Sequence, residues 1–192
     1  MDGALPRSVA TTIGASQPPT PTTKPAPSRT PTAFISGHME ITPQEFTQHY
    51  EPRLHDALAL GHHFVIGDAK GVDASALAYL LAQEHNYPDV QQRITVHVSR
   101  PGQLGRYQAM GVRTVCTTER YDKRDPRARH LNRDAGMTQA SDYDILWART
   151  EREEKAMYGG KWRPRVSATE LNRLRRLEMD ERADGEGVGG WG

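Results

Sequence analysis

The sequence has little cysteine and no long apolar run, and each absence excludes a class of protein. A single cysteine, Cys116, leaves no intramolecular disulfide and no zinc site built on cysteines. No stretch approaches the roughly 20 consecutive apolar residues of a membrane-spanning helix. The first residues also lack the apolar core of a secretory signal. We therefore expect a soluble, cytoplasmic protein.

An excess of one charge sign is also missing. The chain has 25 Lys and Arg against 24 Asp and Glu, a formal net charge of +1. This balance gives no general attraction to nucleic acid or to a membrane surface, and we expect neither as a partner. His62 and His63 would point to opposite faces of a strand, and no other metal-ligating constellation stands out. We predict no metal site and no cofactor.

Composition divides the chain into one domain and two tails. Residues 1–32 are mostly Pro, Thr, Ser and Ala, which cannot bury enough apolar surface to offset the entropy of ordering, so we predict a disordered tail. Residues 183–192 are rich in glycine and are predicted to be flexible. A single domain of 33–182 remains.

Within this domain, short apolar runs alternate with segments of helical periodicity. The apolar runs are rich in β-branched residues and nearly unbroken, which is typical of parallel strands buried on both faces. We predict a Rossmann-like, doubly wound α/β fold with a parallel sheet of about five strands. The predicted strands are 33–37, 62–68, 93–99, 111–118 and 142–148.

Helix-start signals separate these strands. Thr42, Pro43 and Glu45 form a capping box with proline in its favoured place, and Pro52 is expected to bend or break the helix that follows. Asp73 is placed to cap the next helix. Further helices are predicted in a short segment at 103–110, at 126–140 and from Ser167, where Ser167 and Glu170 match a second capping box.

Sheets of this class bind ligands beyond the carboxyl ends of their strands, so each strand-to-helix junction is a candidate site. At the first junction, Ser36 and Gly37 end the strand, and the glycine allows close approach of backbone to a ligand. His38 either donates a hydrogen bond to a phosphate or simply forms part of a turn.

The second junction reads FVIGDAKGVD, residues 64–73. Its glycines fit neither the dinucleotide pattern GxGxxG nor the phosphate-loop pattern GxxxxGK[ST]. Gly67, Ala69 and Gly71 are nevertheless small enough to expose backbone N–H groups at the start of a helix, a position that favours anions. The turn is therefore either a corner with Asp73 as a helix cap or a floor for a phosphate.

Two further segments carry candidate ligand-binding groups. A charged loop follows the last strand, and then Ser167 and Thr169 offer hydroxyl groups at a helix start, although the capping box alone also explains Ser167. Arg133 lies one helical turn before Met137, and its planar guanidinium suits a phosphate or carboxylate. A salt bridge is the alternative role for Arg133.

Taken together, these motifs resemble the SLOG superfamily, which includes the LOG-type phosphoribohydrolases, the DNA-processing protein DprA and the YspA/YpsA-related proteins. The resemblance is carried by ISGH at 35–38, FVIGDAKGVD at 64–73, the segment from Arg133 to Met137, and DYDILW leading to SATELN. It spans nearly all of 33–178 and is greatest to the YspA-like branch.

The resemblance implies a site for a nucleotide or nucleotide-derived ligand. In the LOG-type enzymes an arginine four residues before a methionine, together with a glutamate in a PGGxGTxxE loop, promotes cleavage of the N-glycosidic bond of a nucleoside monophosphate. Arg133 matches that arginine. Asn172 stands at the glutamate position, where an amide cannot act as a base, and Asp68 replaces a family glycine.

Three hypotheses follow. The first is a domain that binds a nucleotide-derived small molecule through its glycine turns, Ser167, Thr169, Asn172 and Arg133. The second is a nucleoside 5′-monophosphate phosphoribohydrolase, in which Arg133 orients the substrate and Glu170 or Asp73 supplies the carboxylate. The third is a non-catalytic scaffold with a vestigial pocket. Relatives often dimerise across helices near the site, so the resemblance leaves a homodimer open.

Overall fold

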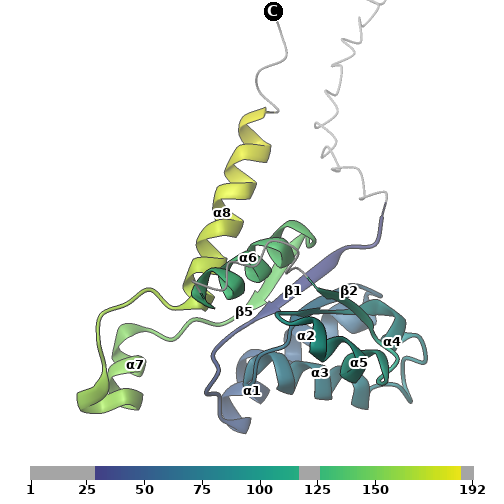
Figure 1. The fold of residues 1–192 in the computed structure, drawn as a ribbon, viewed down its shortest axis with the longest axis horizontal. Helices are drawn as coiled ribbons and strands as arrows, with labels where there is room; N and C mark the ends of the chain where they lie inside the picture. The colour runs from purple at the N-terminus through teal and green to yellow at the C-terminus, as the bar shows by residue number, and fades with distance from the viewer. Residues whose placement is uncertain (1–28, 117–125, 187–192) are drawn as a thin grey trace, which may run out of the picture.

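The computed structural model describes residues 29–116 and 126–186. Its centre is a five-stranded sheet in which every pairing is parallel, with strand order β4-β3-β2-β1-β5 (Figure 1). This confirms the predicted doubly wound α/β class. Residues 1–28 and 187–192 of the predicted tails, and the predicted strand end at 117–118, lie outside the described residues.

The five strands agree with the predicted ones to within about two residues at each described end. Almost every strand residue after the first is buried or half-buried, which explains the unbroken apolar runs in the sequence. The strands are β1 (Thr32–Ser36), β2 (His63–Gly67), β3 (Ile94–Val98), β4 (Arg113–Cys116) and β5 (Tyr143–Leu146).

Helices cover both faces of the sheet (Figure 1). One side carries α1 (Pro43–His49), α2 (Glu51–Ala59), α3 (Val72–Ala82), α4 (Val90–Arg93), η1 (Pro101–Gln103) and α5 (Leu104–Gln108). The opposite side carries α6 (Pro126–Gln139) and the first turns of α8 (Ala168–Glu186), which then extends away from the sheet. Between β5 and α8 lie α7 (Glu151–Tyr158) and η3 (Gly159–Lys161).

The hydrophobic core is divided by the sheet because neighbouring strand residues point to opposite faces. Ile35 and Ile66 belong to the large cluster beneath α1 to α5. Phe34 and Val65, one position earlier on the same strands, pack with Met137 of α6 in a small second cluster. Met137 thus has the core role that its helical spacing indicates.

The predicted signals at the first two helices have different outcomes. The capping box at Thr42 and Glu45 is present, and the helix breaks where expected: α1 ends at His49, and α2 begins at Glu51 with Pro52 in its first turn. The prediction that Asp73 caps α3 is wrong. Gly71 occupies the N-cap position, and Asp73 lies in the first turn.

The segment between β5 and α8 also departs from prediction. It was expected to be a charged loop, but α7 forms within it. Thr150 and Glu153 make a full capping box, in which the Glu153 amide donates to Thr150 Oγ1 and the Thr150 amide donates to the Glu153 carboxylate. The TxxE spacing was the signal for this helix.

At the start of α8 only half of the predicted capping box forms. The Glu170 amide donates to Ser167 Oγ over 3.1 Å, but the Glu170 carboxylate is paired with Arg173. The helix continues to Glu186, past the predicted domain end at Arg182. No described helix is both long and apolar enough to cross a membrane.

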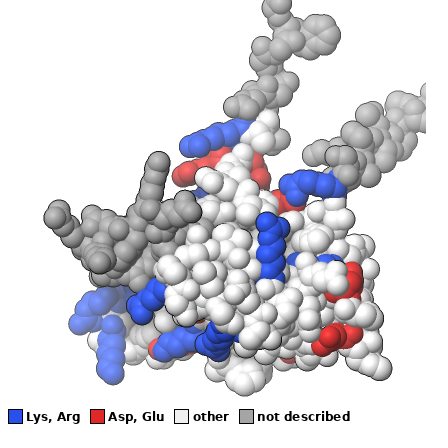
Figure 2. Space-filling model, turned by 45° about the vertical axis from the view of Figure 1, so that its right-hand side comes forward, with Lys and Arg blue, Asp and Glu red and all other residues white. Residues whose placement is uncertain are grey.

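Charged side chains of both signs are scattered over the face shown in Figure 2, and neither sign forms one large patch there. This agrees with the near balance of 25 basic and 24 acidic residues in the sequence. Electrostatic attraction to a ligand must therefore come from local groupings of side chains.

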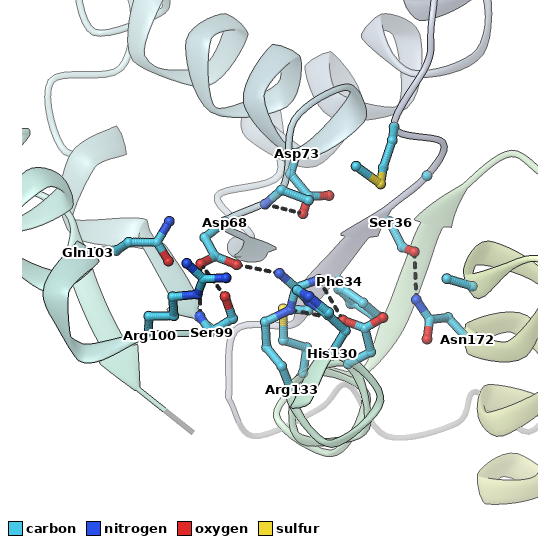
Figure 3. Close-up of a pocket in the computed structure, with 16 residues that line it drawn as sticks. Phe34, Ser36, Asp68, Asp73, Ser99, Arg100, Gln103, His130, Arg133 and Asn172 are labelled. Carbon is cyan, nitrogen blue, oxygen red and sulfur yellow. Dashed lines mark hydrogen bonds and ion pairs between the residues drawn. The ribbon is translucent and has the colours of Figure 1, made fainter. Parts of the chain in front are cut away.

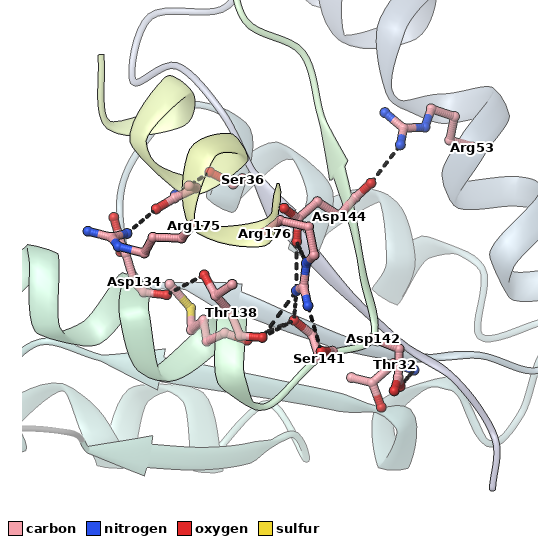
Figure 4. A network of polar contacts seen from close by, with 12 residues as sticks. Thr32, Ser36, Arg53, Asp134, Thr138, Ser141, Asp142, Asp144, Arg175 and Arg176 are labelled. Atoms are coloured by element: carbon pink, nitrogen blue, oxygen red, sulfur yellow. Dashed lines mark hydrogen bonds and ion pairs between the residues drawn. The ribbon is translucent and has the colours of Figure 1, made fainter. Parts of the chain in front are cut away.

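Arg176 joins α8 to β5 and to the end of α6 (Figure 4). Its guanidinium donates to the Thr138 carbonyl, to the Ser141 carbonyl and hydroxyl, and to Asp144 Oδ1. Burial raises the pKa of the Asp144 carboxyl despite the hydrogen bonds from Arg176 that act the other way. Without Arg176, this buried carboxyl would lose its main positive partner.

We expect Arg176→Ala to lower the free energy of unfolding by roughly 3–5 kcal/mol, because it leaves a buried carboxylate unpaired. Arg173→Ala, on the same helix, removes an exposed pair with Glu170 and should lower the free energy of unfolding far less, because solvent screens such pairs. Chemical denaturation of both variants tests this. Equal losses would show that Arg176 has no special structural role.

Candidate functional site

A cavity of about 410 Å³ lies beyond the carboxyl ends of β1, β2 and β3 (Figure 3). We call it the strand-end cavity. Its walls come from the turns after these strands and from α3, α6 and α8. Six residues predicted for the site line it: Ser36, Gly37, Ala69, Asp73, Arg133 and Asn172.

The strand order explains this position. The chain proceeds outward from β1 through β2 and β3 to β4, and then β5 returns to the other side of β1. The connections therefore reverse direction between β1 and β5, where sheets of this class open a crevice. The turn after β1 and the start of α8 both lie at this point.

Arg133 of α6 sits between two carboxylates at the floor of the cavity (Figure 3). One end of its guanidinium pairs with Asp68, and Nε and Nη2 donate to Asp134 Oδ1 over 3.0 and 2.8 Å. The side chain is only 7 % exposed. Arg133 thus has the salt-bridge role considered from the sequence. It also lines the cavity, and its contact with a ligand stays a prediction.

Asp68 is held on two sides. Its Oδ2 accepts hydrogen bonds from the amide and the hydroxyl of Ser99, at 2.8 and 2.9 Å, while Oδ1 faces Arg133. Burial disfavours the charged form, but the Ser99 amide and Arg133 outweigh it and hold the pKa of Asp68 below its ordinary value. Asp68 is therefore a fixed, ionised acceptor in the cavity wall.

The pKa of Asp73 is shifted in the opposite direction to that of Asp68. Burial raises the pKa of its carboxyl to about 7, with Arg133 acting against the increase. One oxygen accepts a hydrogen bond from the Ala69 amide over 3.2 Å. A side chain at Gly67 would begin 2.3 Å from Asp73 Oδ2 and 3.0 Å from Arg133 Cζ, so glycine at 67 lets these two groups approach.

Asp73 should make stability depend on pH. Between about pH 4 and 7 the folded protein holds a proton that the unfolded chain has lost, so the free energy of unfolding falls as the pH rises. Asp73→Asn removes this contribution, at up to about 1.4 kcal/mol per pH unit. Urea denaturation at about pH 5 and about pH 8 should show that the free energy of unfolding of Asp73→Asn, relative to that of the wild type, increases from the lower to the higher pH. Asp56→Asn, on the surface of α2, is the control. If the difference between Asp73→Asn and the wild type is the same at both pH values, the raised pKa of Asp73 is contradicted.

Gly71 has a structural reason to be glycine. Its φ is +81°, and a side chain there would begin 2.3 Å from the His38 carbonyl oxygen. The next amide, of Val72, donates to that same carbonyl over 3.1 Å. With the Ala69 amide bonded to Asp73, part of the turn at 67–71 is used internally, and neither Gly67 nor Gly71 lines the strand-end cavity.

Ser36 and Asn172 close the other side of the cavity. Asn172 is 2 % exposed; its amide nitrogen donates to Ser36 Oγ over 2.8 Å, and its oxygen accepts from Arg175 over 2.6 Å. The Ser36 carbonyl accepts from the Tyr50 hydroxyl. The polar atoms of Asn172 are therefore engaged with the turn after β1 and with α8 itself.

A second cavity of about 450 Å³, the α8 cavity, surrounds the start of α8. It shares Gly37, Met39 and Ala168 with the strand-end cavity, so the two are adjacent. Of the remaining residues predicted to bind ligand, His38, Ser167 and Thr169 line this cavity, whereas Gly67 and Gly71 line neither of the two. Lys70 and Arg165 bring positive charge to the same space, and Glu40 and Tyr158 also line it.

Several hydrogen-bond donors around the α8 cavity have no acceptor among the described residues. The Ala168 and Thr169 amides open the helix and make no hydrogen bond to another described residue. His38, 8 % exposed, accepts the Arg149 amide at Nε2, which leaves the proton of the neutral ring on Nδ1. Burial and then Arg149 lower the pKa of His38, so the ring is neutral near pH 7.

Glu170 is not brought together with Arg133. It lines a third cavity of about 380 Å³, the α7 cavity, which lies between α7, the segment 162–167 and α8. Its carboxylate is paired with Arg173. Of the two carboxylates considered for a hydrolase, Asp73 shares the strand-end cavity with Arg133 and Glu170 does not.

Sequence reasoning missed several residues of these cavities. Ser99, Arg100 and Gln103 follow β3, a junction whose position beyond a strand end was the available signal. Asp134 follows Arg133 directly, but nothing in the sequence indicates that the two side chains pair. Lys70 lies inside the second glycine turn and lines the α8 cavity.

No protein-family model, curated protein or solved structure matches the chain. The resemblance to the SLOG superfamily therefore stays a prediction carried by the motifs.

Proposed function

We propose that this protein binds a nucleotide-derived small molecule, with the nucleoside in the strand-end cavity and its phosphate in the α8 cavity. The observation that carries the proposal is the adjacency of two chemically different spaces. One is lined by carboxylates, and the other offers uncommitted amides and cations. Membership of the SLOG superfamily belongs to the same proposal.

The strand-end cavity suits the hydroxyl groups of a ribose. Asp68 and Asp134 are acceptors fixed by Arg133 and Ser99, and a carboxylate accepts hydrogen bonds from hydroxyl groups. Asp68, Asp73 and Asp134 also make this cavity less favourable for a phosphate, because Arg133 is already paired with two of them and Arg100 is the one other Lys or Arg among the described residues that line it. We therefore place the phosphate in the α8 cavity and not on the glycine turn at 67–71, where the sequence left a phosphate site open.

The α8 cavity suits the phosphate. The start of a 19-residue helix presents the amides of Ala168 and Thr169, and such helix ends favour anions. Lys70 and Arg165 add charge, and the His38 ring supplies an N–H from a buried side chain. Among the described residues that line this cavity, Glu40 is the only one with a carboxylate.

Thermal shift measurements with AMP, GMP, CMP, UMP and the matching nucleosides test the proposal. A ligand that binds only the folded state raises the melting temperature, and at least one monophosphate should do so more than its nucleoside. Lys70→Ala should weaken binding of that monophosphate roughly three- to tenfold and leave the nucleoside unaffected. Lys161→Ala, an exposed lysine outside the three cavities, is the matched control.

No stabilisation by any of these compounds would overturn the proposal and favour the scaffold with a vestigial pocket. If Lys70→Ala weakens binding of the monophosphate and of the nucleoside equally, the proposed placement of the phosphate in the α8 cavity is wrong, and the placement of the nucleoside is unaffected.

A second candidate function, phosphoribohydrolase activity, is favoured by Asp73. A buried carboxyl with a pKa of about 7, close to Arg133, can exist in either protonation state near neutral pH, as a general acid or base requires. In such a reaction water adds to C1′ of the ribose, the bond from C1′ to the base breaks, and the base leaves with a proton. Asp73 would donate that proton to the base and regain one from the attacking water.

If the protein is such a hydrolase, chromatography of incubated AMP or CMP will detect free base, and Asp73→Asn will reduce its release at least about 100-fold. Asn172→Glu, which restores the family carboxylate, should raise the rate. No release by either the wild type or Asn172→Glu would leave ligand binding as the function.

A homodimer belongs to the same proposal. Leu131 of α6 and Leu174 and Leu177 of α8 are 40 %, 39 % and 44 % exposed, and a second copy packing on these helices would cover them. The mass in solution by light scattering decides between one and two chains of 21.4 kDa.

A further inference from the structure

The three cavities lie next to one another around the start of α8. The strand-end and α8 cavities share Gly37, Met39 and Ala168. The α8 and α7 cavities in turn share Arg165, Val166 and Ser167. A ligand whose phosphate occupies the α8 cavity therefore has a neighbouring cavity on each side.

Two residues that line the α7 cavity each have a buried donor without an acceptor among the described residues. Arg149 is 8 % exposed, and its Nε and Nη2 are bonded to Glu45 and to the Glu40 carbonyl, but its Nη1 has no partner. The indole Nε1 of Trp162 also has no partner. Buried polar groups in folded proteins are nearly always hydrogen-bonded, so two unmatched donors on residues of one cavity wall leave hydrogen bonds for a ligand to make.

An acceptor faces the same space. Glu154 of α7 is 8 % exposed, and its carboxylate makes no hydrogen bond or ion pair with any described residue. The positive charge of Arg149 is already balanced by Glu45, and Glu151 and Glu170 also line the cavity. Glu151 and Glu170 are paired with Lys155 and Arg173, but a further anion would meet the carboxylate of Glu154, which has no cation partner among the described residues. A hydroxyl group, in contrast, can donate to Glu154 and accept from Arg149 or Trp162.

We propose that the ligand continues past its phosphate as a phosphate-linked, hydroxylated group such as a sugar, held in the α7 cavity by Arg149, Trp162 and Glu154. This inference rests on the proposed function, because it takes the phosphate to lie in the α8 cavity. It narrows the ligand class from nucleotides in general to nucleotide sugars and similar conjugates. α7 and the segment that follows it supply two of the three groups.

Calorimetric titration of two matched series tests the inference: AMP, ADP and ADP-ribose, and UMP, UDP and UDP-glucose. In at least one series the sugar conjugate should bind at least about tenfold more tightly than both the monophosphate and the diphosphate, since several hydrogen bonds of roughly two- to tenfold each are added. The diphosphates separate the effect of a second phosphate from that of the sugar.

Two variants locate the added contacts. Trp162→Phe keeps the aromatic ring but deletes the N–H, and Glu154→Gln keeps the shape but removes the charge. Each should weaken the sugar conjugate roughly two- to tenfold and leave the monophosphate unchanged. Arg152→Gln, an exposed position on α7 that lines none of the three cavities, should change neither.

The outcomes separate the two proposals. A monophosphate that binds as well as its sugar conjugate, or a Trp162→Phe variant that weakens both equally, would overturn the extension into the α7 cavity and leave the proposed function standing. If no compound in either series binds, the proposed function fails and the extension fails with it.

Discussion

The hydrogen bond from the Val72 amide to the His38 carbonyl holds two strand-to-helix turns together, and the rest of the site depends on it. Gly71 makes the contact possible because no side chain fits between these backbones. Once the turn after β1 is fixed there, its other groups become anchors: Ser36 for Asn172, and the His38 ring for the Arg149 amide. Segments more than 130 residues apart in the sequence thus meet on one short turn.

The buried charges around Arg133 hold the carboxylates of Asp68 and Asp134 in position and add little to the net stability of the fold. Bringing an arginine and two carboxylates out of water costs about as much as their attraction returns. What the cluster achieves is placement, since Asp68 and Asp134 can neither rotate nor exchange partners freely while Arg133 and Ser99 hold them. A ligand that uses these acceptors finds them already oriented, which reduces the entropy lost on binding.

Much of the fold could be predicted because its signals are local. The apolar runs of β1 to β5, the capping box at Thr42 and the break at Pro52 all follow from neighbouring residues. α7 was missed because a highly charged composition concealed the cap at Thr150 and Glu153. The site was predictable only in part: strand order brings the turns together, but side-chain pairing decides their roles. No local pattern shows that Arg133 is neutralised or that α7 encloses a cavity.

The pairing of β1 with β5 has a consequence for how the chain folds. β1 lies between β2 and β5, and its partner on one side is about 110 residues away along the chain, as in the pairing of Ala33 with Tyr143. Until β5 is made, β1 is an exposed edge that can pair with the wrong strand or another chain. During synthesis, the first half of the domain therefore has an incomplete sheet until β5 has left the ribosome. The rate-limiting closure is expected to be this late, long-range pairing.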